Sequence, residues 1–314
     1  MTNIRVRWTK SRVAPLLVAL ATILAVPACA SDGPGEPTSA ASGKPIVLTT
    51  FTVLANIASN VAGDHLVVES ITKPGSEIHG YEPTPSDLRT AEQASLILDN
   101  GLGLESWFER FVTTAGAPHS VVSEGIDPIA IAAGDYEGKA NPHAWMSPIE
   151  AQVYIDNIAA AFADLDPANA ADYRANADEY KAEVARIGDE LITALDSVPP
   201  AQRALVSCEG AFSYLARDAG LQEQYLWAVN QEQESAPREI ARLVDFVRDN
   251  EVPSVFCEST VSDRGMQQVA REAGTSFGGI LYVDSLSEPD GPVPTYLDLL
   301  RHDVTVIIEG LTTP

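Results

Sequence analysis

The stretch that decides the fold is GSEIHGYEPTPSD, residues 75–87, in which glycine and proline exclude both helix and strand. It follows LVVESI (66–71), an apolar and β-branched run typical of a strand, and Pro85-Ser86-Asp87 can begin a helix. His79 is therefore predicted on a strand-to-helix connection, where open α/β sheets bind their ligands. A lone loop histidine is more often solvated, so the hypothesis needs similar residues at equivalent positions.

Strands and helices alternate around this stretch. The patterns predict strands at 46–50, 66–71, 95–100 and 120–123, and helices at 51–63, 87–94 and 104–116. Strands separated by helices indicate a parallel sheet covered on both faces. The chain has 314 residues, which is enough for about two such domains.

A second histidine lies in a similar place. The long connection 124–147 contains NPH, and connections of that length inside compact domains tend to be functional. His143 precedes a predicted helix at 149–165, with Ser147 as a plausible N-cap and Pro148 in the first turn.

A long amphipathic helix is predicted next, over 166–195, and Pro199-Pro200 ends it. Its apolar residues step by three or four, at Tyr173, Ala177, Tyr180, Val184, Ile187, Leu191 and Leu195. We interpret this helix as a rigid spine between two lobes; a helix that belongs to one lobe alone is the alternative.

The second half repeats the α/β alternation. Strands are predicted at 203–208, 222–229, 254–259 and 277–283, with helices between them and further helices over 295–311. Glu209 ends the first of these strands and Asp284 follows the last, which is again the ligand position of an α/β sheet. The predicted fold is thus two α/β lobes, each a parallel sheet flanked by helices, joined by one long helix.

The four candidates, His79, His143, Glu209 and Asp284, suit a divalent metal ion. Two neutral imidazoles and two carboxylates carry a charge of about −2, which offsets the ion's charge and allows its burial. Nitrogen and hard oxygen donors together favour Mn(II), Fe(II) or Zn(II). Each residue alone has an ordinary explanation, but four such coincidences are less probable than one site.

The N-terminus is typical of an exported lipoprotein. Residues 1–28 have a basic head and a short apolar run, as in a signal peptide, and VPAC resembles a lipobox that ends in Cys29. Ser, Gly and Pro dominate the tether that follows. The expected boundaries are signal peptide 1–28, lipidated cysteine and tether 29–45, N-terminal lobe 46–165, linking helix 166–198 and C-terminal lobe 199–314.

The mature chain is strongly acidic. Removing residues 1–28 takes away four basic residues and no acidic residue, so the formal charge changes from −24 to −28. Such a surface argues against nucleic acid or anionic lipid as a partner.

Six segments resemble the metal-binding receptors of bacterial ABC importers, the manganese and zinc lipoprotein family: GSEIHGYEPTPSD, NPHAWMSP, VSCEGAFSYLARDAG, YLWAVNQEQESAPREI, VFCESTVSDR and LYVDSL. The resemblance implies two lobes joined by a long helix, with metal held by His79, His143, Glu209 and Asp284. Zinc-specific members more often have a third histidine at the position of Glu209, and a His-rich loop. The chain departs from the family at Glu77-Ile78, where Asp-Pro is usual, and at Cys208.

The expected function is capture of extracytoplasmic Mn(II), with Zn(II) or Fe(II) as alternatives, and delivery to a permease with a cytoplasmic ATPase. The protein is expected to be a monomer, lipid-anchored to the outer face of the cell membrane, with no catalytic cofactor. Two other classes remain open. A metallohydrolase would need an open coordination position and a general base. A surface adhesin would need no closed cation site.

Cys208 and Cys257 are predicted to form a disulfide. Each precedes a glutamate at the carboxyl end of a strand, and the two can bridge if those strands are neighbours. With Cys29 lipidated they are the remaining cysteines of an exported chain. Two buried free thiols are the alternative.

Overall fold

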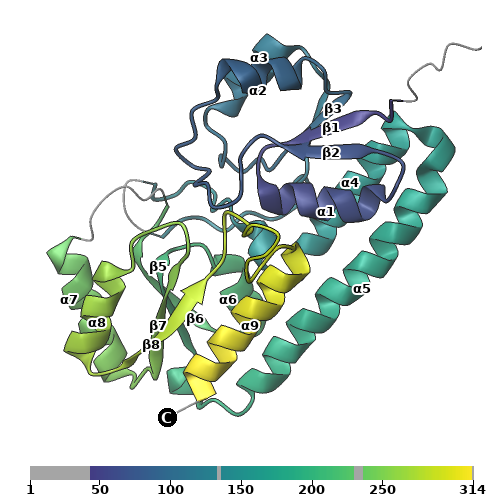
Figure 1. The fold of residues 1–314 in the computed structure, drawn as a ribbon. Coiled ribbons are helices and arrows are strands. Elements are labelled where there is room, and N and C mark those ends of the chain that lie inside the picture. The colour runs from purple at the N-terminus through teal and green to yellow at the C-terminus, as the bar shows by residue number, and fades with distance from the viewer. Residues whose placement is uncertain (1–42, 133–135, 230–235, 313–314) are drawn as a thin grey trace, which may run out of the picture. The chain divides into compact units, whose positions relative to one another are not determined.

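The protein is described by a computed structural model that covers residues 43–132, 136–229 and 236–312 (Figure 1). The expected signal peptide, Cys29 and most of the tether lie outside these residues. Gly43–Pro314 forms one compact unit. Within the described ranges, no helix combines the length and apolar character that crossing a membrane requires.

The N-terminal half, residues 43–165, contains a four-stranded parallel sheet in the order β2-β1-β3-β4. The central strands are apolar and mostly buried, as expected for a sheet covered on both faces. The strands are β1 (Ile46–Thr49), β2 (Val67–Ser70), β3 (Leu96–Asp99) and β4 (His119–Val121). The helices are α1 (Thr52–Ala62), α2 (Pro85–Ala91), α3 (Phe108–Ala115) and α4 (Glu150–Leu165).

The loop that holds His79 runs between β2 and α2, as predicted. Thr84 caps α2, because its hydroxyl accepts a hydrogen bond from the Asp87 amide while the Asp87 carboxylate accepts one from the Thr84 amide. Pro85 occupies the first turn. The sequence therefore fixes where this loop ends.

The helix after His143 begins later than predicted. A short 3-10 turn (Ala144–Met146) follows the histidine, and α4 starts at Glu150. Ser147 is not the N-cap, although its hydroxyl accepts hydrogen bonds from the amides of Ile149 and Glu150. The start differs from the prediction by one residue, and the Ser147 hydroxyl still satisfies the free amides at this end of the helix.

The long helix is α5 (Ala170–Leu195), 26 residues preceded by a 3-10 turn (Pro167–Asn169). All seven apolar positions predicted to face the core are buried. The helix packs against α1 and α4 of the N-terminal half and against α6 and α9 of the C-terminal half (Figure 1). It therefore contacts both halves.

The C-terminal half, residues 199–312, differs in part from the single parallel sheet predicted. Its strands form two parallel pairs, β5 with β6 and β7 with β8. The strands are β5 (Ala204–Glu209), β6 (Gln222–Trp227), β7 (Ser254–Glu258) and β8 (Ser276–Leu281). The helices are α6 (Ser213–Ala219), α7 (Pro237–Asp249), α8 (Arg264–Ala273) and α9 (Tyr296–Thr312). The predicted terminal helices are one helix, α9, which has no internal glycine until Gly310.

One apolar core crosses between the halves. It includes Phe51 and Trp145 from the N-terminal half, Leu191 from α5, and Phe212 and Tyr296 from the C-terminal half, all fully buried. Burial of apolar surface stabilises a fold by about 25 cal/mol per Å² removed from water. The shared core therefore stabilises the contact between the two halves that carry the candidate ligands.

Candidate metal centre

The structure brings together the four side chains that the sequence singles out. His79 lies between β2 and α2, His143 before α4, Glu209 at the end of β5, and Asp284 after β8. One potential ligand atom from each lies within 4.8 Å of the corresponding atoms of the others. Both halves therefore contribute two side chains to one cluster.

The distances between these ligand atoms match the distances between donor atoms around a bound first-row metal ion. His79 Nε2 is 3.0 Å from His143 Nε2 and 3.3 Å from Glu209 Oε1. The His143 Nε2 atom is 3.7 Å from Glu209 Oε1, and both Nε2 atoms are 3.8 Å from Asp284 Oδ1. Donors arranged tetrahedrally about 2.1 Å from a metal lie about 3.4 Å from one another. The cluster therefore has the dimensions of a coordination shell.

Both carboxylates are buried and lack hydrogen-bond partners in the described residues. The Glu209 and Asp284 side chains are about 1% exposed, and none of their four oxygens has a hydrogen-bond partner among the described residues. A buried carboxylate oxygen without a partner is costly, and native proteins rarely contain one that has no role. A cation between the two carboxylates would satisfy these oxygens.

The pKa values of these side chains also show that their charged forms are unfavourable without a cation. Burial, with the nearby Glu77 charge, raises the pKa of Glu209 well above its usual value. Burial, with the neighbouring Glu209 charge, raises the pKa of Asp284 to about 8, although His79 opposes this rise. Burial, with the neighbouring His79, lowers the pKa of His143 well below its usual value. The cluster therefore disfavours its own charges in the absence of a cation, and keeps His143 in the neutral form that metals bind.

The first departure from the family pattern has a structural role. The Glu77 carboxylate accepts hydrogen bonds from the amides of His79 (2.7 Å) and Gly80 (2.8 Å). These two bonds fix the loop on both sides of the imidazole. Sequence reasoning noted the unusual residue but not this contact.

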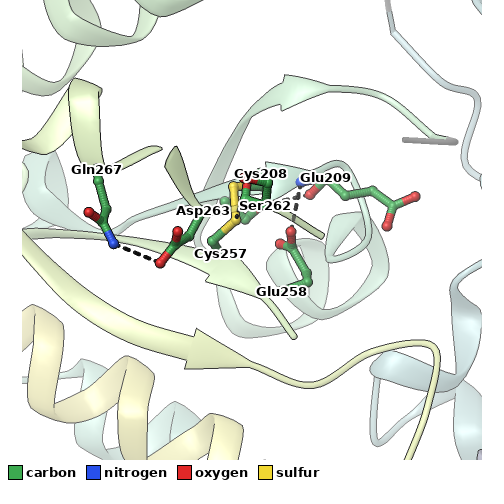
Figure 2. Close-up of a disulfide and its surroundings, with 8 residues drawn as sticks. Cys208, Glu209, Cys257, Glu258, Ser262, Asp263 and Gln267 are labelled. Carbon is green, nitrogen blue, oxygen red and sulfur yellow. Dashed lines mark hydrogen bonds between the residues drawn. A yellow bond between two sulfur atoms is a disulfide. The ribbon is translucent and has the colours of Figure 1, made fainter. Parts of the chain in front are cut away.

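The disulfide partners lie beside a candidate ligand. Cys208 in β5 and Cys257 in β7 are joined as a disulfide with their Cα atoms 4.8 Å apart (Figure 2). In the next residue pair, Glu258 Oε2 accepts a hydrogen bond from the Glu209 amide (Figure 2). In the described part of the chain, β5 and β7 do not pair through their backbones. The disulfide and the Glu258 side chain connect these two strands instead. Because the two sulfurs bond each other, they are not available as metal ligands.

The Asp284 loop is connected to the His79 loop. Ser285 Oγ accepts a hydrogen bond from the Gly75 amide (2.7 Å), and Leu286 donates its amide to the Thr52 hydroxyl (2.9 Å). These contacts join segments more than 200 residues apart in the sequence. Sequence patterns carry no signal for such pairs.

Comparison with known proteins places this chain in a family. Residues 47–310 match the family model described as zinc-uptake complex component A, periplasmic. The chain belongs to the zinc-uptake component A family. As a member of this family it is the periplasmic metal-binding component of an ABC metal transporter and not an enzyme, which excludes the metallohydrolase.

Relatives of this chain are named for different metals. The chain is 47% identical over 295 residues to the iron-binding protein YfeA of Yersinia pestis, with 94% of each chain covered. It is 32% identical over 309 residues to the manganese ABC transporter substrate-binding lipoprotein PsaA of Streptococcus anginosus, covering 96% of this chain and 99% of PsaA. The family membership therefore does not identify the metal.

Solved structures support the same fold. A Mn-bound periplasmic metal-binding protein from Candidatus Liberibacter asiaticus has 40% sequence identity and a TM-score of 0.80, with 85% of this chain and 100% of that chain covered. The periplasmic zinc-binding protein TroA of Treponema pallidum has a TM-score of 0.78 at 22% identity, covering 86% of this chain and 99% of TroA. At that identity the similarity to TroA concerns the fold alone.

Proposed function

We propose that this zinc-uptake family member captures Mn(II) outside the cytoplasm and delivers it to the permease of its ABC importer. The cluster of His79, His143, Glu209 and Asp284 is the proposed binding site. The observation that carries the proposal is the four carboxylate oxygens that are buried with no hydrogen-bond partner among the described residues. Residues 46–165 and 199–314 are then the two lobes that supply two ligands each, with 166–198 as the linking helix.

The number of available donors favours manganese. Two imidazole nitrogens and four carboxylate oxygens offer up to six donors, more than the four of a tetrahedral zinc site. Mn(II) accepts oxygen-rich sites of higher coordination number. Zn(II) lies above Mn(II) in the general affinity order, so we expect Zn(II) to bind at least as tightly in vitro. Any preference of the site for Mn(II) must then come from its coordination geometry.

Iron is the second candidate. The relative with 47% identity is named as an iron-binding protein. Fe(II) is next to Mn(II) in the affinity order and accepts the same nitrogen and oxygen donors. The donor set alone does not separate the two ions.

The test is the metal bound in the native envelope together with competitive titration. We expect protein purified without chelator to contain Mn in elemental analysis. Glu209→His removes a charge and a potentially bidentate ligand, so the ratio of Mn(II) to Zn(II) affinity should fall. Glu209→Gln is the matched control, because it removes the charge without adding an imidazole. A ratio unchanged by Glu209→His would reject the role of Glu209 in selectivity.

The N-terminal proposals concern Cys29 and a tether of which the structure describes only residues 43–45. We propose that Cys29 is lipidated, that the monomeric protein is anchored to the outer face of the membrane, and that residues 30–45 act as a tether. Mass spectrometry of the mature N-terminus tests the anchor, and Cys29→Ala should release the protein into the soluble fraction. A protein that binds no metal in titration would instead favour the adhesin alternative.

A further inference from the structure

Asn141 connects the two halves of the candidate metal centre. Its side chain is buried, with 2% of the residue exposed, two residues before His143. The side-chain Nδ2 donates to the Gly210 carbonyl at 2.6 Å and to Ser213 Oγ at 3.1 Å. Gly210 directly follows Glu209, so one amide spans the loops of two candidate ligands from opposite halves.

The contacts of Asn141 fix which way its amide points. A backbone carbonyl can only accept a hydrogen bond, so the NH₂ group must face Gly210. The Ser213 hydroxyl donates to Glu223 Oε2, which leaves its oxygen free to accept the second bond from Asn141. The Asn141 Oδ1 atom must then face His143.

The amide oxygen in turn determines the state of the imidazole. Asn141 Oδ1 is 3.0 Å from the His143 amide nitrogen and 2.9 Å from His143 Nδ1. An amide oxygen has no proton to donate, so Nδ1 must carry the hydrogen of this bond. In the neutral ring, Nε2 then has the free lone pair, and this atom faces His79, Glu209 and Asp284.

We propose that Asn141 is a positioning residue that holds His143 in the Nδ1–H tautomer and orients its Nε2 lone pair toward the metal. The proposal rests on the proposed function, since it assumes that His143 is a ligand.

The direct test is the ring tautomer, measured by ¹⁵N NMR of histidine side chains in metal-free protein, with His143 assigned by the signal lost in His143→Gln. In the parent protein we expect a protonated Nδ1 and an unprotonated Nε2 on His143. An Nε2–H tautomer would overturn the proposal. This measurement needs no metal, so it remains decisive even if the proposed function fails.

Variants separate positioning from general packing. Asn141→Ala should mix the two tautomers and weaken Mn(II) binding by about 10–100-fold, the usual effect of losing the partner of a metal-bound histidine. Asn141→Asp keeps an acceptor opposite Nδ1 but loses the donor that faces the Gly210 carbonyl, so it should restore the Nδ1–H tautomer of His143 without restoring the full Mn(II) affinity.

The matched control is Asn157→Ala. Asn157 likewise donates two side-chain hydrogen bonds, to the carbonyls of Val122 and Glu124, and neither bond involves a candidate ligand. Asn157→Ala should leave the tautomer and the Mn(II) affinity unchanged. An equal loss of affinity in both alanine variants, or parental affinity and tautomer in Asn141→Ala, would overturn the proposal.

Discussion

Replacing Asp284 by asparagine should stabilise the metal-free protein while it weakens metal binding. Burial raises the pKa of Asp284 from 3.8 to about 8, so the folded protein binds more protons than the unfolded chain between these pH values. Its stability therefore falls as the pH rises through that window. Asparagine is neutral, has nearly the same shape, and avoids this linkage.

The size of the effect follows from the pKa difference. At pH 7 the Asp284 carboxyl would be ionised in the unfolded chain and largely protonated in the folded protein. Because pH 7 lies about 3 units above the unfolded pKa, taking up this proton on folding costs about 4 kcal/mol. We take this as an upper value for the gain in Asp284→Asn. At about 2 °C per kcal/mol for a chain of this size, the melting temperature would rise by up to about 8 °C.

Thermal and urea unfolding of chelator-treated protein at pH 4 and pH 7 would measure the gain. We expect a large gain at pH 7 and little at pH 4. The exposed Asp189→Asn is the control and should change the free energy of unfolding by less than about 0.5 kcal/mol. With Mn(II) at about 100 times its Kd, the parent should gain about 3 kcal/mol and Asp284→Asn much less. Equal stability of the two metal-free proteins at pH 7, or the same gain at both pH values, would refute the reasoning.

Three further predictions concern other parts of the molecule. Alanine at any one of the four candidate ligands, His79, His143, Glu209 or Asp284, should weaken Mn(II) binding strongly; an unchanged affinity would remove that residue from the site. The buried Trp145 has its ring centre 5.2 Å from that of His143, so its fluorescence should follow the titration. Unfolded, unreduced mature protein should contain no free thiol from Cys208 and Cys257, and Cys208→Ser with Cys257→Ser should cost up to about 4 kcal/mol because the bridge spans 49 residues; two titratable thiols would contradict the disulfide. Burial raises the pKa of Glu105 from 4.5 to about 7, so its contribution to stability falls as the pH rises between these values, and Glu105→Gln should flatten that part of the curve in urea unfolding; an unchanged pH dependence would contradict this.

The sequence by itself determined the features that depend on local pattern. The three-to-four spacing of apolar residues identified α5 and its seven buried positions, because helix periodicity is written in neighbouring residues. Apolar runs placed Glu209 and Asp284 at the carboxyl ends of strands, and the helix signals after His79 and His143 placed these histidines on loops that enter helices. The rule for ligand sites in α/β sheets then predicted that these positions converge. Residue chemistry at those ends was sufficient to suggest a divalent metal.

Only the tertiary structure decided how these pieces meet. The amide of Asn141 reaches a carbonyl 69 residues away, and Ser285 reaches Gly75 over 210 residues. The second sheet divides into two pairs, with a disulfide and Glu258 joining β5 to β7. The raised pKa of Glu209 likewise depends on burial and on the charge of Glu77, which is distant in the sequence. Such contacts depend on packing between distant segments, and no local periodicity encodes them.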